Sequence, residues 1–216
     1  LNAGGRDRSF RVHVPALYDP THPTPLVFDF HGYTMTGQSQ ETMTRFAAKS
    51  DQAGFVVVHP DGTGVVQGWN AGRCCGTAAS TGVDDVGFVD AMIAELDARL
   101  CIDRKRIYAT GFSNGGFLSH RLGCERADVF AAIAPVSGVM GIDGCAPARP
   151  MPVMHVHGTA DTIVPYNGSP TLGYEAAATT VAGWVARDHC TAAPVETFAQ
   201  GDARCEATRG DRKSVV

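Results

Sequence analysis

The chain has 216 residues, 44% of them hydrophobic and 19% charged, and a formal net charge of −4. This length and composition predict a single globular domain, residues 1–216, with a sizeable core. The acidic balance and the lack of a run of Lys or Arg argue against a nucleic-acid partner. No apolar stretch reaches the roughly 18 residues of a membrane span, so a membrane partner is not expected either.

The strands and helices of the first half of the chain are separated by clear turn signals. Strands are expected at residues 10–14, 26–30 and 55–58. Helices are expected over residues 39–53, with Ser39 as N-cap and Gly54 just past the end, and over residues 84–100, with Asp84 and Asp85 at the start. Residues 63–82 between them are expected to form a loop.

The second half continues the alternation of strands and helices. Strands are expected at residues 106–112, near 131–136 and at 153–156. The tail holds the segments 195–198 and 205–208, and residues 214–216 resemble the start of a buried strand. Helices are expected directly after Ser113 and near residues 174–188. Apolar strands that alternate with helices predict the α/β class, with a mostly parallel sheet covered by helices on both faces.

The cysteines indicate the compartment of the protein. Their spacings lack the paired C-x-x-C ligands and partner histidines of a zinc site. They favour disulfides and therefore predict a secreted protein, extracellular or periplasmic. Their odd number requires a free thiol or a partner outside these residues, and the pairing stays open, although adjacent Cys74 and Cys75 are each expected to reach a distant cysteine. The seven are Cys74, Cys75, Cys101, Cys124, Cys145, Cys190 and Cys205.

A G-x-S-x-G sequence at residues 111–115 stands between a predicted strand and a predicted helix. A serine on such a turn is held in an exposed, strained position, and glycines flank it because side chains there would collide with the strand and the helix. The following helix directs its N-terminal N–H groups at the serine, where negative charge develops in acyl transfer. Ser113 is therefore the candidate nucleophile.

A serine nucleophile needs a base and a group that orients the base. Asp161 follows the strand at 153–156 and is the candidate acid, with a turn or capping role as the alternative. After it the chain has only His189, at the end of a predicted helix, where a favourable contact with the helix dipole is the better interpretation. His155 and His157 precede the aspartate and are interpreted as core or supporting residues.

The oxyanion hole needs two backbone N–H donors. Asn114, the residue after the nucleophile, is expected to supply one, and Tyr33, in the loop after the strand at 26–30, the other. Gly32 lets that loop fold close to the serine, and His31 is interpreted as structural. Trp69 stands in a loop of small residues and is a candidate for stacking on an aromatic or sugar-like substrate, with a core position as the alternative.

Five stretches of sequence carry a family resemblance. They are Pro25-Leu26-Val27 leading into His31-Gly32, Gly68-Trp69-Asn70 with Cys74-Cys75-Gly76, Val83 to Phe88, Tyr108 to Gly116, and His157 to Asp161. Together they resemble the secreted polyhydroxybutyrate-depolymerase and feruloyl-esterase branch of the α/β-hydrolases, from about residue 8 to the end. The resemblance implies an α/β-hydrolase fold and an extracellular carboxylic-ester hydrolase with Ser113 as nucleophile, Asp161 as acid and no metal or organic cofactor.

The chain departs from that family after Ser214-Val215-Val216, where members continue into a cysteine and a loop with the catalytic histidine. We therefore expect a longer polypeptide, truncated here at the C-terminus, with the base and an eighth cysteine in the missing part; an intact mass near 22.7 kDa would contradict this.

The predicted function is a serine esterase acting on feruloyl esters of plant polysaccharide or on short polyhydroxyalkanoate chains. An acetylxylan esterase, a serine peptidase on the same fold and a non-catalytic binding member are the alternatives. The sequence leaves the oligomeric state open.

Overall fold

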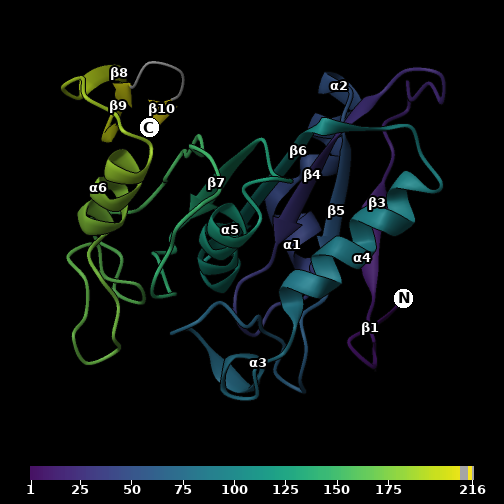
Figure 1. The fold of residues 1–216 in the computed structure, drawn as a ribbon, viewed down its shortest axis with the longest axis horizontal. Helices are drawn as coiled ribbons and strands as arrows, with labels where there is room; N and C mark the ends of the chain where they lie inside the picture. Colours follow the sequence, from purple (N-terminus) through teal and green to yellow (C-terminus); the bar gives the residue numbers. More distant parts are fainter. Residues whose placement is uncertain (210–213, 216) are drawn as a thin grey trace.

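The structure is a computed structural model that describes residues 1–209 and the backbone of residues 214–215 (Figure 1). Its centre is a five-stranded sheet in the order β3-β5-β4-β6-β7. The strands are β3 (Phe10–His13), β4 (Thr24–Phe30), β5 (Val56–Pro60), β6 (Ile102–Phe112) and β7 (Ala132–Val136). Strand β3 is antiparallel and lies at one edge, as expected from Pro15, and the other four strands are parallel.

The segment 153–156 extends the sheet beyond β7. It joins through two isolated parallel bridges, Ile133 with Val153 and Val136 with Val156. The predicted strand at this place is therefore present only as two contacts. Those contacts still fix the direction of the chain, which leaves the sheet at the same edge as the carboxyl ends of β6 and β7.

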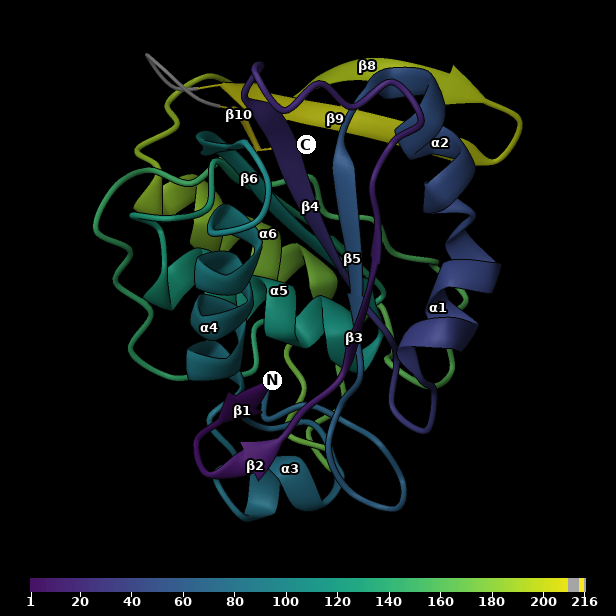
Figure 2. The same ribbon diagram turned by 90° about the vertical axis from the view of Figure 1, so that its right-hand side faces the viewer.

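Helices cover both faces of the sheet (Figure 2). Helices α1 (Gly37–Thr44) and α2 (Phe46–Ala53) lie on one side, and α4 (Asp85–Asp97) and α5 (Asn114–Glu125) lie on the other. Every residue of β5 is buried, because a parallel strand covered on both faces has no solvent side. The α/β class and the mostly parallel sheet predicted from the sequence are thus confirmed.

The single helix predicted over residues 39–53 is wrong. Arg45 has a φ of 55°, in the left-handed region, and this residue divides the segment into α1 and α2. The N-cap is Thr36 and not Ser39, which instead sits at the third helical position and completes a capping box. Gly54 ends α2 with a φ of 72°, as expected.

Smaller elements flank this core. The region predicted as the loop 63–82 contains a short helix, α3 (Gly76–Ser80), and α6 (Ala177–Arg187) follows the long loop after the segment 153–156. Two short strands, β1 (Asn2–Ala3) and β2 (Arg6–Asp7), form an N-terminal hairpin. Strands β8 (Val195–Gln200), β9 (Ala203–Arg209) and β10 (Ser214–Val215) form a separate antiparallel sheet, and the prediction for Val216 lies outside the described residues.

Two disulfides are present among the described residues. Cys124 at the end of α5 pairs with Cys145, with Cα atoms 5.6 Å apart. Cys74 pairs with its neighbour Cys75, so the expectation that each would reach a distant cysteine is wrong. The Cα atoms of these two residues are 3.2 Å apart, and the peptide between them is cis.

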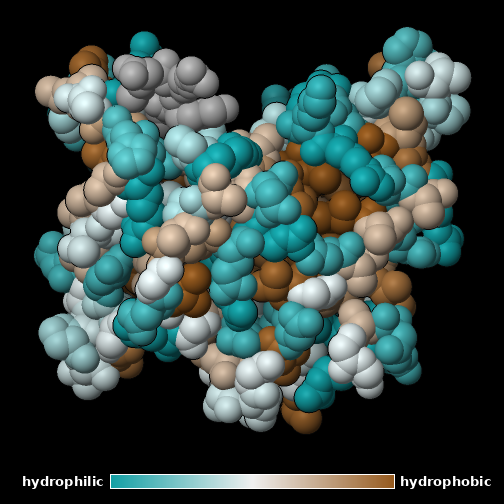
Figure 3. Space-filling view, in the orientation of Figure 1, coloured by the Kyte–Doolittle hydropathy of each residue, from teal (hydrophilic) through white to brown (hydrophobic). Residues whose placement is uncertain are grey.

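Polar side chains cover most of the face of the molecule that carries α4 and α5, and apolar side chains gather above α4 (Figure 3). Between β3 and α4, a cavity of about 330 Å³ is lined by Phe10, Val12, Leu96 and Leu100.

None of the helices described is long and apolar enough to cross a bilayer.

Candidate active site

Ser113 occupies a sharp turn between β6 and α5. Its φ of 53° and ψ of −116° lie in a region that L-residues rarely adopt. The turn is held by two backbone bonds: Ser113 N–H donates to Val136 O at 2.9 Å, and Phe117 N–H donates to Ser113 O at 3.0 Å. The side chain of Ser113 is half-buried, so the hydroxyl is held at the surface end of the sheet by backbone geometry.

The glycines around Ser113 have no space for a side chain. A Cβ at Gly111 would lie 2.6 Å from Gly115 O, and a Cβ at Gly116 would lie 2.7 Å from Val136 O. A Cβ at Gly115 would overlap Phe30 O on the neighbouring strand β4. The steric reason given for these glycines from the sequence therefore holds, and the strands approach the helix so closely only because the side chains are absent.

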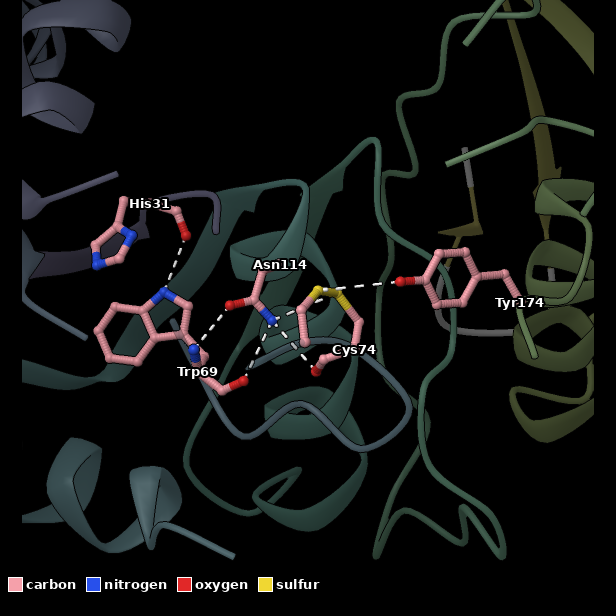
Figure 4. The surroundings of a disulfide bond; sticks show 6 residues. His31, Trp69, Cys74, Asn114 and Tyr174 are labelled. Carbon is pink, nitrogen blue, oxygen red and sulfur yellow. Dashed lines mark hydrogen bonds between the residues drawn. A yellow bond between two sulfur atoms is a disulfide. The ribbon is translucent and has the colours of Figure 1, made fainter. Parts of the chain in front are cut away.

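Asn114 is the first residue of α5, so its backbone N–H has no acceptor within the helix and is free to face an oxyanion. Its side chain is fully buried and binds the loop before α3 (Figure 4). Asn114 Oδ1 accepts from Trp69 N–H at 2.7 Å, and Asn114 Nδ2 donates to Trp69 O at 3.2 Å and to Cys74 O at 3.3 Å. The amide thus holds this loop against the turn at Ser113.

Tyr33 lies in the loop after β4, as expected, and its ring packs against two glycines. A Cβ at Gly68 would lie 2.8 Å from the Tyr33 ring, and one at Gly76 would overlap the ring. Gly32 approaches the strand that ends at the serine, because a Cβ there would lie 3.1 Å from Phe112 Cδ1. The loop with Tyr33 is therefore packed directly against the segment that precedes Ser113.

Trp69 is fully buried, which overturns its assignment as a stacking surface for substrate. Its indole N–H donates to His31 O at 2.9 Å (Figure 4). Its ring meets Phe30 edge-on, with ring centroids 5.4 Å apart. Figure 4 also shows Tyr174 beyond the Cys74–Cys75 pair, with its hydroxyl 4.0 Å from Cys75 Sγ. A large aromatic ring whose N–H finds a hydrogen-bond partner is stable in a core, which agrees with the alternative of a core position for Trp69.

Asp161 lies on the loop that follows the segment 153–156, at the edge of the sheet where Ser113 also stands. Its Oδ1 accepts from Ile163 N–H at 2.8 Å and from Val164 N–H at 2.9 Å. These bonds to the following turn agree with the alternative that Asp161 shapes a turn. They also leave Oδ2 available, and His157 Nε2 lies 3.8 Å from it.

The histidines singled out in the sequence have separate environments. His31 is buried, with Nδ1 2.7 Å from Gly32 O and Nε2 accepting from Gly62 N–H, which agrees with a structural role. His189 is exposed just after α6, with a φ of 53°. His155 contacts both His157 and His120 of α5, and His120 was not singled out in the sequence.

Burial governs the protonation of these rings. Loss of solvation lowers the pKa of His120 well below its usual value, and the neighbouring His155 and His157 rings lower it further. The same burial, followed by the charge of His157, lowers the pKa of His155 to about 4. Both rings are therefore neutral at neutral pH.

A buried ion pair supports the loop with Trp69, and sequence reasoning missed it. Arg8 donates to Asp85 Oδ1 at 2.8 Å, and Asp85 Oδ2 accepts from Asn70 N–H at 2.7 Å. Burial raises the pKa of Asp85, although Asn70 N–H and the Arg8 charge favour its ionised form. The sequence signal was the pair of aspartates at the start of α4, of which Asp84 is the N-cap and only Asp85 turns inward.

The chain is similar in sequence to known feruloyl esterases. It is 34% identical over 201 residues to feruloyl esterase B of Piromyces equi, covering 87% of this chain and 37% of that protein. It is 32% identical over 179 residues to a probable feruloyl esterase C of Aspergillus flavus, covering 80% of this chain and 62% of that protein. The chain thus spans only part of the length of these relatives.

Among solved structures, the acetyl xylan esterase of Aspergillus awamori superposes with a TM-score of 0.70 at 19% identity, covering 97% of this chain and 86% of that one. This likeness confirms the α/β-hydrolase fold. The family model described as Esterase PHB depolymerase matches residues 13–172, a range that includes both Ser113 and Asp161. The chain belongs to the esterase PHB depolymerase family.

Proposed function

We propose that this chain is the catalytic domain of a serine carboxylic-ester hydrolase that works through an acyl-enzyme. The observation that carries the proposal is the strained backbone of Ser113 between β6 and α5, in a setting where the neighbouring glycines leave no room for side chains. Backbone strain of this kind persists where the surrounding structure enforces it, and it is concentrated at functional sites. Membership of an esterase family supports the same conclusion.

In the proposed reaction Ser113 Oγ attacks the ester carbonyl carbon while a histidine base removes its proton. The backbone N–H groups of Asn114 and Tyr33 stabilise the oxyanion, the C–O bond breaks, and the protonated base transfers its proton to the departing alcohol. Water then attacks the acyl-enzyme by the same route and releases the acid. Asp161, through Oδ2, orients the base and stabilises its charged form.

The general base is the one group of this mechanism to which we assign no residue of the chain. His31, His59 and His120 are fully buried, and His189 is exposed beyond α6. Both ring nitrogens of His155 and His157 have hydrogen-bond partners within the fold. His13 pairs with Asp51, and His22 pairs with Asp19. The proposal therefore takes the base from a histidine outside these 216 residues.

The proposed substrates are feruloyl esters of plant polysaccharide or short polyhydroxyalkanoate chains, with acetylated xylan as the alternative. The names of the relatives and the family support these classes. The burial of Trp69 removes the structural argument for an aromatic substrate, so the preference for feruloyl esters rests on the relatives alone. The Cys124–Cys145 disulfide supports the proposal that the protein is secreted.

The experiment that tests this function is covalent labelling with an organophosphonate, followed by a substrate panel. We expect labelling of one site, lost in Ser113→Ala and retained in Ser80→Ala, whose serine is exposed on α3. Methyl ferulate, acetylated xylan and a hydroxybutyrate oligomer would then rank the substrates. Labelling that persists in Ser113→Ala would refute the nucleophile, and turnover of peptidyl amides in preference to esters would indicate a peptidase. Ligand binding without any turnover would indicate a non-catalytic member.

A further inference from the structure

We propose that His120, His155 and His157 form a neutral hydrogen-bond chain that positions the loop carrying Asp161. The three are positioning residues, since they act on the proposed acid through the fold. The role of Asp161 in this inference rests on the proposed function. The hydrogen-bond chain of the three histidines rests only on the contacts of their rings.

The chain begins at an indole and ends at a carbonyl. Trp184 Nε1 of α6 donates to His120 Nδ1 at 3.0 Å, and His120 Nε2 lies 3.3 Å from His155 Nδ1. His155 Nε2 lies 3.3 Å from His157 Nδ1, and His157 Nε2 lies 2.7 Å from Val164 O. Five groups from α5, α6 and the segment 155–164 are thus connected in one line.

The two ends determine the proton on every ring. An indole N–H can only donate and a carbonyl can only accept, so each Nδ1 must be an acceptor and each Nε2 must carry the hydrogen. All three rings are then neutral Nε2–H tautomers. A proton added to His155 or His157 would bind Nδ1 and turn this acceptor into a donor. It would then face the Nε2–H of the preceding ring, and the hydrogen bond between those two rings would be lost.

The hydrogen-bond chain is connected to Asp161 through the backbone of Val164. Val164 O accepts from His157, and Val164 N–H donates to Asp161 Oδ1 at 2.9 Å. Because Oδ1 also accepts from Ile163 N–H, the turn fixes one oxygen of the carboxylate and leaves Oδ2, 3.8 Å from His157 Nε2, to face a base. The position of Oδ2 therefore depends on the turn at residues 161–164, and the hydrogen bond from His157 to Val164 O holds that turn in place.

The surroundings favour the uncharged state of the chain. The side chains of His120 and Trp184 are fully buried, and that of His157 is 1% exposed. His120 faces the Gly138 carbonyl and the cationic Arg187 of α6, and His157 faces the Tyr166 ring and the Asp161 carboxylate. Arg187 and the adjacent rings oppose a further positive charge, and Asp161 is the group here that would attract one.

Nitrogen NMR tests the chain directly. Long-range ¹H–¹⁵N spectra of the ¹⁵N-histidine-labelled full chain at neutral pH should show Nε2–H tautomers for all three rings. His31 is the internal control, because its bonds to Gly32 O and Gly62 N–H require the opposite, Nδ1–H tautomer. An Nδ1–H tautomer or a charged ring at His120, His155 or His157 would overturn the chain.

Two substitutions test the positioning role. Gln at residue 155 can accept through Oε1 and donate through Nε2, so His155→Gln preserves the chain, whereas His155→Leu interrupts it. With ester turnover normalised to the phosphonate-labelled fraction, we expect His155→Leu to lower kcat about 10- to 100-fold with KM little changed, and His155→Gln to stay within about threefold of wild type. Loss of folded protein alone would lower the labelled fraction and not the normalised kcat.

The outcomes separate this inference from the proposed function. Failure of Ser113 to label refutes the serine mechanism and with it the role of Asp161, whatever the tautomers are. Normal labelling and turnover in His155→Leu refute the positioning role and leave the serine esterase standing.

Discussion

Asn114 and Trp69 bind each other twice: Trp69 N–H donates to Asn114 Oδ1 at 2.7 Å, and Asn114 Nδ2 donates to Trp69 O at 3.2 Å. Asn114 therefore has a structural role through its side chain, in addition to the oxyanion role proposed for its backbone N–H. The side chain holds a loop against the start of α5, and the same loop packs its glycines on the ring of Tyr33. Both proposed oxyanion donors thus depend on one buried amide.

The first prediction concerns this amide. Asn114→Asp keeps an acceptor for Trp69 N–H but loses the donor to Trp69 O and Cys74 O, and it buries a negative charge beside the proposed position of the oxyanion. We expect kcat to fall at least about 100-fold, as when one oxyanion donor is lost. Steady-state kinetics on a simple aryl ester measures this, and a kcat within threefold of wild type would contradict the assignment. Asn114→Ala separates the effect of charge from the loss of the bonds.

The second prediction concerns the space around the serine. In Gly115→Ala the new Cβ overlaps Phe30 O, whereas a Cβ at Gly158 meets nothing within 4 Å. We expect Gly115→Ala to lower the free energy of unfolding by about 3 kcal/mol or to prevent folding, and Gly158→Ala to change it by less than about 0.5 kcal/mol. Urea unfolding of the two variants makes the comparison. Equal stabilities would mean that the strand and helix are not packed as described.

The third prediction separates the two interpretations of Trp69. Trp69→Phe removes the indole N–H from His31 O inside the core, which leaves a buried acceptor without its donor. The free energy of unfolding should fall by about 1–3 kcal/mol. The ratio of KM for methyl ferulate to KM for methyl acetate should not change, because the ring does not reach substrate. A selective rise in KM for the ferulate would instead restore the stacking role.

The fourth prediction concerns the Cys124–Cys145 disulfide, which closes a loop with a sequence separation of 21. Replacing both cysteines by serine should cost about 3 kcal/mol of stability, from the loop-closure entropy of the unfolded chain. Cys101→Ser is the matched control, since the thiol of Cys101 is not in a disulfide. Thermal unfolding with and without reductant gives both values, and a double variant as stable as the control would argue against the pairing.

The fifth prediction uses the lowered pKa of His155. Its folded pKa of about 4 lies below the unfolded value of 6.5, so the unfolded chain binds more protons between these limits and stability falls as the pH drops through them. Relative to His155→Gln, wild type should lose about 2 kcal/mol between pH 7.5 and about pH 5. Urea unfolding of both proteins at the two pH values gives the change in unfolding free energy of each. Subtracting one change from the other removes the contribution of the other titrating groups, which both proteins share. Parallel pH profiles would show that His155 titrates normally.

The sequence predicted the periodic elements well. The helix expected at 84–100 is α4 (Asp85–Asp97), and the strand expected at 106–112 is the carboxyl-terminal part of β6, because burial on a fixed face leaves a repeating pattern. The turn at Ser113 was predictable for a different reason, because the G-x-S-x-G pattern stands between a strand and a helix that the sequence also predicts. Its glycines leave room for backbone that is distant in the sequence, such as Phe30 O and Val136 O.

Features that depend on a single backbone angle or on distant contacts were not predictable. Arg45 adopts a left-handed φ that nothing in its type requires, so the break between α1 and α2 has no sequence signal. The histidine chain joins residues separated by 35 positions across α5 and the segment after β7. The inward turn of Trp69 likewise depends on His31, 38 residues earlier.

The close packing around Ser113 limits which substitutions this part of the protein can accept. Substitution at Gly111, Gly115 or Gly116 would force backbone apart, so variant libraries that randomise these codons will yield few folded clones. The loop at Gly158 has open space, so the same libraries should recover most substitutions at that codon as folded protein.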